Sequence, residues 1–330
     1  MMKRFPASVE ALKGKHILVT GGAGFIGSNL VEALLSLEAR VTVLDNLATG
    51  FEENLEEFAG NANFSFVKGD IRDAETCSKV LKGIDAISHQ AALGSVPRSI
   101  EFPLTTHDVN ATGFLTILQA AKEAGIHRFV YASSSSVYGD SLASPKAEGM
   151  EGNALSPYAV SKQLNEQYAG VYYRLHNMQT IGLRYFNVFG PRQNPDGVYA
   201  AAIPKFLDKM KHGGEIIVNG DGNQTRDFTF VQNAVLANLL SLSSTNERAY
   251  GRVYNVACGR SLTLNDVIGS LEDGLKTSGI SPVHSLVYGP KRVGDIQDSL
   301  ADISAIHQAI GYEPIFTFEE GISRYLAFNG

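Results

Sequence analysis

The sequence predicts an α/β protein with a doubly wound, mostly parallel sheet and a smaller α/β lobe in its C-terminal part. Short β-rich runs alternate with helix-like segments over the first half of the chain, which is the pattern of successive βαβ units. A glycine-rich turn joins the first strand-like run to the first helix-like segment. After Asn187 the chain changes to long segments rich in Pro, Gly and Asn, which indicates a second lobe that covers a ligand.

The elements of the expected sheet follow in a regular order. A strand over Ile17–Thr20, a helix over Phe25–Leu37 and a strand over Val41–Leu44 form the first βαβ unit. The later elements are strands at Phe64–Val67, Ala86–Ser88, Phe129–Ala132 and Thr180–Leu183, with helices over Asn110–Ala124 and Tyr158–Leu175.

The first domain is expected to be discontinuous, because the apolar run Val253–Ala257 is typical of one more strand that returns to the sheet. We therefore expect a cofactor domain of residues 1–186 plus about 232–257. The smaller, substrate-binding domain would comprise residues 187–231 plus about 258–330.

The composition excludes several classes of function. The 330 residues are 44% hydrophobic and 19% charged, which is ordinary for a globular protein. A net charge of −6 without long basic runs makes nucleic acid a poor partner. Cys77 and Cys258 have no metal-ligand spacing, so neither a disulfide framework nor a metal site is expected. No apolar stretch has the length of a signal peptide or a membrane span, and we expect a cytoplasmic protein.

The glycine turn points to a dinucleotide site. Gly21, Gly24 and Gly27 lie between a strand and a helix, where small residues let a pyrophosphate approach the positive end of the helix. Asp45 closes the second strand, where a carboxylate can accept hydrogen bonds from both ribose hydroxyls. The same charge would repel a 2′-phosphate, so we expect NAD rather than NADP. Asp70 and Ile71 could meet the adenine, although Asp-Ile is also a common turn.

Tyr158 and Lys162 are the candidate catalytic pair. Four residues apart on a helix, they share one face, and a nearby ammonium group favours the phenolate form, which can take a proton from a hydroxyl. The same spacing is frequent on ordinary amphipathic helices. The Tyr-Lys pair indicates a catalytic site here because of a second feature. The strand Phe129–Ala132 ends in the run Ser133–Ser136, which places hydroxyls at the ligand-binding edge of the sheet.

Taken together, these motifs resemble those of extended short-chain dehydrogenases/reductases. The resemblance is closest to bacterial UDP-N-acetylhexosamine 4-epimerases of the UDP-galactose 4-epimerase family and spans about Lys15 to Ile322. It rests on the glycine turn, on His89–Ala92, on the serine strand end, on Tyr158 and Lys162, and on the segment Arg184–Arg192. In the segment Ala91–Ser99 the chain resembles the subgroup that acts on hexosamines.

The resemblance implies a Rossmann domain, NAD as cofactor and reversible 4-epimerisation of UDP-N-acetylglucosamine and UDP-N-acetylgalactosamine through a 4-keto intermediate. UDP-glucose and UDP-galactose are further candidate substrates. The catalytic residues would be Ser134, Tyr158 and Lys162. The residues expected to contact the cofactor are Gly21, Gly24, Phe25, Ile26, Gly27, Asp45, Asn46, Asp70, Ile71, Gln90, Ala91, Ala92, Tyr158 and Lys162. Those expected to bind the nucleotide sugar are Ser95, Ser135, Ser136, Asn187, Ala201, Arg226, Arg292 and Ser299.

The resemblance carries two further expectations. Ser299 corresponds to a position beside the hexose, where a bulky Tyr restricts the pocket to glucose and galactose and a small residue leaves room for an N-acetyl group. The family also implies a homodimer, in which the helices Asn110–Ala124 and Tyr158–Leu175 of two subunits form a four-helix bundle.

Three alternatives stay open at this point. A nucleotide-sugar 4,6-dehydratase is expected to have an acidic pair at the strand end, where this chain has Ser135 and Ser136. A 4-epimerase of UDP-N-acetylhexosaminuronic acid fits the same motifs. A non-catalytic NAD-binding sensor would keep the fold without the chemistry, and the intact Ser134, Tyr158 and Lys162 argue against it. The residues alone do not distinguish uridine from thymidine.

Overall fold

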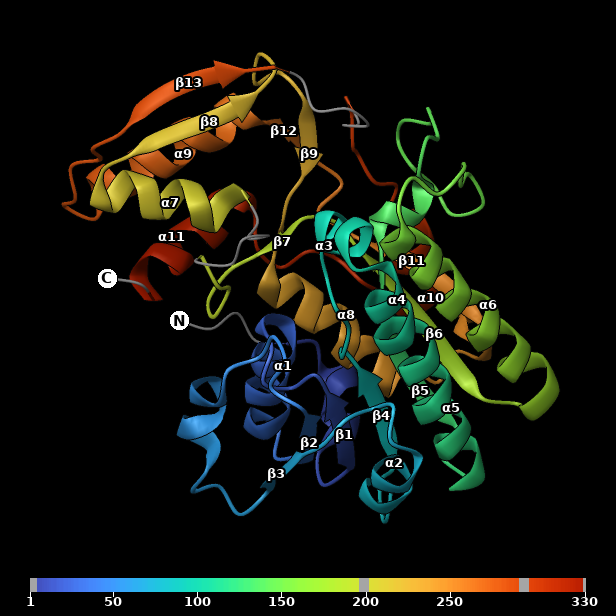
Figure 1. Ribbon diagram of the computed structural model, residues 1–330. Helices are drawn as coiled ribbons and strands as arrows, with labels where there is room; N and C mark the ends of the chain where they lie inside the picture. The colour runs from blue at the N-terminus through green and yellow to red at the C-terminus, as the bar shows by residue number, and fades with distance from the viewer. Residues whose placement is uncertain (1–4, 196–201, 291–296, 329–330) are drawn as a thin grey trace.

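The computed structural model describes residues 5–195, 202–290 and 297–328, and its centre is a parallel sheet (Figure 1). Seven strands lie in the order β11-β6-β5-β4-β1-β2-β3, and every neighbouring pair is parallel. This order confirms the predicted doubly wound sheet. The strands are β1 (His16–Thr20), β2 (Arg40–Asp45), β3 (Phe64–Lys68), β4 (Ala86–His89), β5 (Arg128–Ser134), β6 (Gln179–Tyr185) and β11 (Arg252–Val256).

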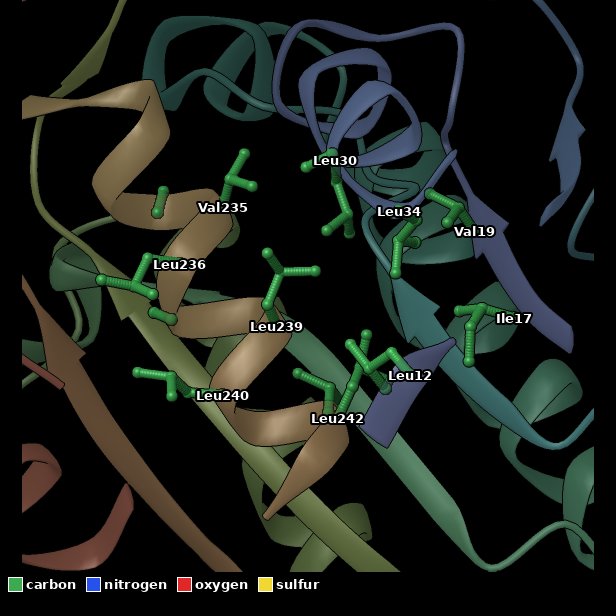
Figure 2. Packing of buried hydrophobic residues seen from close by; sticks show 14 of the residues in the cluster. Leu12, Ile17, Val19, Leu30, Leu34, Val235, Leu236, Leu239, Leu240 and Leu242 are labelled. Atoms are coloured by element: carbon green, nitrogen blue, oxygen red, sulfur yellow. The ribbon is translucent and has the colours of Figure 1, made fainter. Parts of the chain in front are cut away.

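Helices cover both faces of this sheet. On one face α1 (Phe25–Ser36) and α8 (Val231–Ser243) share an apolar core with β1 (Figure 2). Leu30 and Leu34 of α1 lie there opposite Val235 and Leu239 of α8. The second core, on the other face, is formed by α2 (Ala74–Val80), α5 (Gly113–Glu123) and α6 (Pro157–His176). Burial on both faces explains the continuous apolar runs by which the strands were predicted.

The long helix α6 has clear end signals in the sequence. The hydroxyl of Ser156 accepts a hydrogen bond from the backbone N–H of Ala159 at 3.1 Å, and Pro157 fills the first helical position. Asn177 ends the helix in the left-handed conformation, at φ 54°. Two short helices, α3 (Val96–Glu101) and α4 (Pro103–His107), contact α6. Short 3₁₀ helices occupy Ala7–Leu12, Glu52–Phe58, Ser135–Tyr138 and Glu247–Ala249, and a π-helical turn at Asp108–Thr112 leads into α5.

The smaller lobe has three two-stranded sheets and three helices around its own core. The sheets pair β7 (Val188–Phe189) with β10 (Thr229–Phe230), β8 (Glu215–Asn219) with β13 (Ser285–Gly289), and β9 (Thr225–Asp227) with β12 (Ser261–Thr263). The helices are α7 (Ala202–His212), α9 (Leu264–Thr277) and α11 (Phe318–Phe328). Phe189, Phe206, Phe230 and Leu271 are among the buried residues of this core.

One helix differs from the expected division of the chain. The helix α10 (Ser304–Ile310) contacts β11, and Ile306 and Tyr312 are buried in the core of the larger lobe. Residues 258–330 therefore do not all pack in the smaller lobe. We propose the remaining boundaries as predicted. Among the described residues, no helix combines the length and apolar character needed to cross a membrane.

Candidate active site

The glycine turn between β1 and α1 is packed so closely that side chains would not fit. A Cβ atom on Gly21, which has φ +70°, would lie 2.6 Å from the backbone nitrogen of Ala91. A Cβ atom on Gly27 would lie 2.1 Å from the carbonyl oxygen of Gly21. The first turn of α1 has no acidic residue, and Gly24 caps it without a side-chain hydrogen bond. The N–H groups of this turn thus face the cleft at the positive helix end, which suits a pyrophosphate.

Asp45 lies at the carboxyl end of β2 and is 8% exposed. Its carboxylate accepts hydrogen bonds from the backbone N–H groups of Ala23, at 3.0 Å, and Leu47, at 2.8 Å. Burial raises the pKa of this carboxyl, and the two hydrogen bonds oppose that effect. The carboxylate also lines the cleft, and each oxygen can accept a further bond. It is therefore placed to hold a ribose diol.

A single cleft of about 730 Å³ contains every residue that the sequence analysis assigned to the cofactor, from Gly21 through Asp45 and Gln90 to Lys162. Ser95 lines the same cleft and has the unusual backbone angle φ 103°. Asp70 and Arg72 form an ion pair of 2.7 Å at the wall, and this pair holds the pKa of Asp70 well below its usual range. The chemistry of the wall, with glycine N–H groups, a diol acceptor and Tyr158, fits a dinucleotide.

Tyr158 and Lys162 face the cleft from the first turns of α6. The Lys162 ammonium donates to the carbonyl oxygen of Ala132 at 2.8 Å and lies 5.9 Å from the centre of the Tyr158 ring. Burial lowers the pKa of Lys162 to about 8, and the charge of Glu166 opposes this shift. Burial raises the pKa of Tyr158, and a hydrogen bond with Ser134 opposes the rise. The expected lowering of the tyrosine pKa by Lys162 is therefore not observed, because burial outweighs other effects.

A buried ion-pair network lies behind this pair. Arg184 of β6 is 3% exposed and pairs with Glu166 at 2.7 Å and with Glu151. Glu166 also accepts a hydrogen bond from the hydroxyl of Ser133 at 2.6 Å. Glu166 follows Lys162 by four residues on α6, so the network joins the catalytic helix to the ends of β5 and β6.

A second pocket, of about 340 Å³, lies in the smaller lobe. Two predicted nucleotide-binding residues, Asn187 and Arg226, line it. The amide of Asn187 donates to the backbone carbonyl of Asp227 at 3.0 Å, which ties the end of the β6 segment to β9. Ala201 and Arg292, which were also predicted to bind the nucleotide sugar, lie outside the described residues.

The remaining predicted sugar contacts lie close to β5 and β9. Ser134 ends β5, and its hydroxyl accepts a hydrogen bond from the N–H of Ser136 at 3.2 Å. Ser135 and Ser136 form the helical turn that follows. Ser299 is 7% exposed, and its segment lies along β9, because Thr225 donates to the carbonyl of Gln297 at 2.9 Å. Neither pocket is lined by these four serines.

Several residues at these sites escaped the sequence analysis. Gln193 and Asn194 line the large cleft, and Lys205, Asn219 and Gln224 line the smaller pocket. Gln193, Asn194 and Asn219 belong to the Pro/Gly/Asn-rich segments that follow Asn187, and Gln224 lies two residues before Arg226, whereas Lys205 stands in neither kind of segment. Glu166 could have been found from the sequence, because it follows Lys162 by four residues, as Lys162 follows Tyr158, and so lies on the same face of the helix.

The sequence of this chain is similar to that of known proteins over most of its length. The family model described as the NAD dependent epimerase/dehydratase family matches residues 17–257. A UDP-glucose 4-epimerase of Mycolicibacterium smegmatis is 34% identical over 313 residues, which cover 94% of this chain and 97% of that protein.

Two solved structures show the same architecture. A UDP-N-acetylglucosamine 4-epimerase from Methanobrevibacter ruminantium M1, in complex with UDP-N-acetylmuramic acid, is 38% identical with a TM-score of 0.89, covering 96% of this chain and 98% of that one. A UDP-glucuronic acid 4-epimerase from Bacillus cereus, in complex with UDP-glucuronic acid and NAD, is 29% identical with a TM-score of 0.84, covering 95% of this chain and 98% of that one.

Proposed function

The chain belongs to the NAD-dependent epimerase/dehydratase family, and we propose that within it the protein interconverts UDP-N-acetylglucosamine and UDP-N-acetylgalactosamine by 4-epimerisation. Its cofactor is NAD. The proposal rests chiefly on one observation. Tyr158 and Lys162 line the same cleft as the glycine turn and Asp45, and Ser134 is hydrogen-bonded to Tyr158. A proton acceptor therefore lies beside the space that the dinucleotide fills.

In the proposed reaction the phenolate form of Tyr158 takes the proton of the sugar O4 hydroxyl, and the resulting phenol later returns it. Ser134 is hydrogen-bonded to Tyr158 and thereby orients the sugar O4 hydroxyl beside the phenol. Lys162 adds positive charge behind the phenol and is held in place by the Ala132 carbonyl. NAD, when bound, supplies the acceptor and donor of the hydride at sugar C4. The 4-keto sugar is released only after reduction, so its nucleotide must stay anchored while the hexose turns.

The smaller pocket supports the anchoring step. Arg226 and Asn187 line it, and an arginine can pair with a diphosphate through two parallel hydrogen bonds. Lys205 lines the same pocket and adds a second cation. We assign the uridine diphosphate to this pocket, with Ala201 and Arg292 as further contacts.

The choice of an N-acetylated sugar is supported by small side chains. Ser299 is a small, buried side chain rather than an exposed loop residue, and the family resemblance assigns its position to the neighbourhood of the hexose. The helical turn after β5 carries Ser135 and Ser136, whereas a 4,6-dehydratase is expected to carry an acidic pair there. Among the alternatives, the Bacillus cereus structure supports the carboxylate part of the UDP-N-acetylhexosaminuronic acid proposal, because it holds UDP-glucuronic acid, which has the acid group but no N-acetyl group.

The proposed assembly is a homodimer in which α5 and α6 of two subunits form a four-helix bundle. Apolar side chains on this side of the molecule are exposed in the single chain. Val160 of α6 is 45% exposed, and Leu104 of the neighbouring α4 is 85% exposed. Burial of these groups against a second copy would stabilise a dimer.

The decisive experiment is a product assay over a panel of UDP-sugars. The panel contains the glucose, N-acetylglucosamine, glucuronic acid and N-acetylglucosaminuronic acid forms together with their 4-epimers. We expect the fastest conversion for the two N-acetylhexosamines. Faster conversion of an acidic sugar would favour the uronic acid alternative, and a 4-keto-6-deoxy product would indicate a dehydratase. Bound NAD without any product would mean that the protein is a sensor rather than an enzyme.

A further inference from the structure

We infer that residues 191–194, which we call the strap, hold NAD in its cleft, with Gln193 and Asn194 as cofactor contacts and Arg192 as the positioning residue that fastens the strap to the larger lobe. The strap follows β7, the first strand of the smaller lobe (Figure 1). The inference rests on the proposed function, because an epimerase that regenerates its cofactor in each cycle needs to retain it.

The strap lies against α1 and forms part of the wall of the dinucleotide cleft. Gln193 and Asn194 line this cleft together with Gly24 and Gly27 of the glycine turn. One wall is thus supplied by residues that follow β1, and another by residues more than 160 positions later in the chain. A ligand in this cleft would therefore be lined both by the glycine turn and by a segment that follows the first strand of the smaller lobe.

Arg192 attaches the strap to the larger lobe through several contacts. Its side chain is 7% exposed, and one guanidinium nitrogen pairs with Glu32 of α1 at 2.9 Å and with Glu57 of the short helix Glu52–Phe58. The guanidinium carbon also lies 5.7 Å from the ring centre of Phe58. The guanidinium is buried although the side chains of Glu32 and Glu57 are 42% and 56% exposed, and a single arginine shared by carboxylates from two separate elements restrains the strap at two points.

A second contact attaches the strap to α1, and a third orients Gln193 within its own segment. The buried amide of Asn29, in α1, donates to the carbonyl of Pro191 at 3.0 Å. Gln193 is oriented by its own amide, which donates to the carbonyl of Val188 at 3.2 Å. Within the part of the chain that the structure describes, the side-chain oxygen of Gln193 is buried and has no hydrogen-bond donor. This acceptor is available to a donor group of the dinucleotide.

The backbone of the strap shows why it requires support. Arg192 has φ +66°, in the left-handed region where a residue with a side chain is strained. Such strain persists only where surrounding contacts determine the conformation. The two carboxylates and the Asn29 amide provide those contacts from outside the cofactor cleft, since neither Glu32 nor Glu57 lines it.

The test measures cofactor exchange rather than turnover. Protein carrying isotopically labelled NAD is chased with unlabelled NAD, and the label retained on the protein is counted over time. We expect Arg192→Ala and the double variant Glu32→Gln/Glu57→Gln to release NAD at least tenfold faster than the unaltered protein. Gln193→Ala should also accelerate release, and Arg192→Lys should have an intermediate effect because it keeps the charge without the planar guanidinium.

Arg260→Ala is the matched control. It removes an arginine that pairs with Glu319 at 2.9 Å in the smaller lobe and lines neither pocket, so its exchange rate should stay within twofold of the unaltered protein. If Arg192→Ala and the double carboxylate variant both fold and both release NAD at the unaltered rate, the inference is wrong. Exchange is counted without substrate, so a protein that forms no epimer contradicts the proposed function alone.

Discussion

The ammonium group of Lys162 lies 5.9 Å from the centre of the Tyr158 ring and is hydrogen-bonded to the carbonyl of Ala132 instead of to the phenol. The lysine is therefore positioned by the end of β5 rather than by a hydrogen bond to the tyrosine. This arrangement separates two functions in the proposed reaction. The phenol exchanges the proton, and the lysine provides charge and a fixed donor.

Replacing Tyr158 by Phe removes the proton acceptor and preserves most of the packing. We expect turnover to fall by about a hundredfold or more, while NAD stays bound, because the glycine turn and Asp45 are unchanged. Turnover is measured by product formation and retained NAD by extraction from the purified protein. A variant that keeps turnover within a few-fold would remove Tyr158 from the mechanism.

Replacing Lys162 by Met should abolish most activity and yet stabilise the protein near pH 7. Burial lowers the lysine pKa from 10.5 to about 8, so protonation favours the unfolded chain, and the cost of burying the charge is fully present below pH 8. This cost disappears as the pH rises from about 8 to above 10.5, where both states lose the proton.

The expected gain at pH 7 is on the order of 1–2 kcal/mol after loss of the bond to Ala132. Urea unfolding of the two NAD-free proteins at pH 7 and pH 10 measures it. The advantage of the Met variant should shrink at the higher pH. No advantage at pH 7 would show that the lysine charge is not buried.

Replacing Asp45 by Arg should weaken NAD binding by at least tenfold and improve NADP binding. The change removes the acceptor for the ribose hydroxyls and introduces a cation that can pair with a 2′-phosphate. Asp45→Asn is the control, because it keeps the shape and removes only the charge. Titration with both cofactors gives the preference, and an unchanged ratio for the Arg variant would place the ribose elsewhere.

Replacing Ser299 by Tyr tests the choice of sugar. The added ring should fill the space for an N-acetyl group, so kcat/KM for UDP-GlcNAc and UDP-GalNAc should fall at least tenfold. Activity on UDP-Glc and UDP-Gal should be kept or improved. Measurement of all four sugars in both proteins provides the internal control. An equal loss for both pairs of sugars would mean that Ser299 does not select the substrate.

The predicted dimer is tested by light scattering at micromolar concentration. Val160→Asp places a charge on an exposed apolar position of α6 and should shift the protein towards a monomer. Val283→Asp alters an apolar residue of the smaller lobe that is exposed to 63%, more than the 45% of Val160, and should leave the dimer intact. A monomeric unaltered protein would refute the four-helix arrangement.

The sequence predicted the large sheet well because its signals are local. Each strand is a short apolar run, and the ends of α6 are marked by Ser156, Pro157 and Asn177. The glycine turn and Asp45 could be found because chemistry requires those residue types at a fixed distance from a strand.

The smaller lobe and the back of the site could not be predicted in the same way. Strands such as β7 and β10 have two residues each and exist only because distant segments meet. Gln193 lines the cleft as part of the strap, whose attachment depends on Glu32 and Glu57, and no local pattern links these residues. The direction of the Tyr158 pKa shift was missed because burial depends on the packed protein.

The last strand of the large sheet, β11, enters the sheet only after the chain has passed through part of the smaller lobe. During synthesis on a ribosome, β6 therefore emerges before its neighbour β11 and has an open edge. The apolar surface of α1 and β1 stays uncovered until α8 has been made (Figure 2). The nascent chain cannot complete this core until about residue 312 has left the exit tunnel, because Ile306 and Tyr312 are buried in it. Until β11 has been made, the free edge of β6 can pair with strands of other chains, which is the general risk of an unprotected sheet edge.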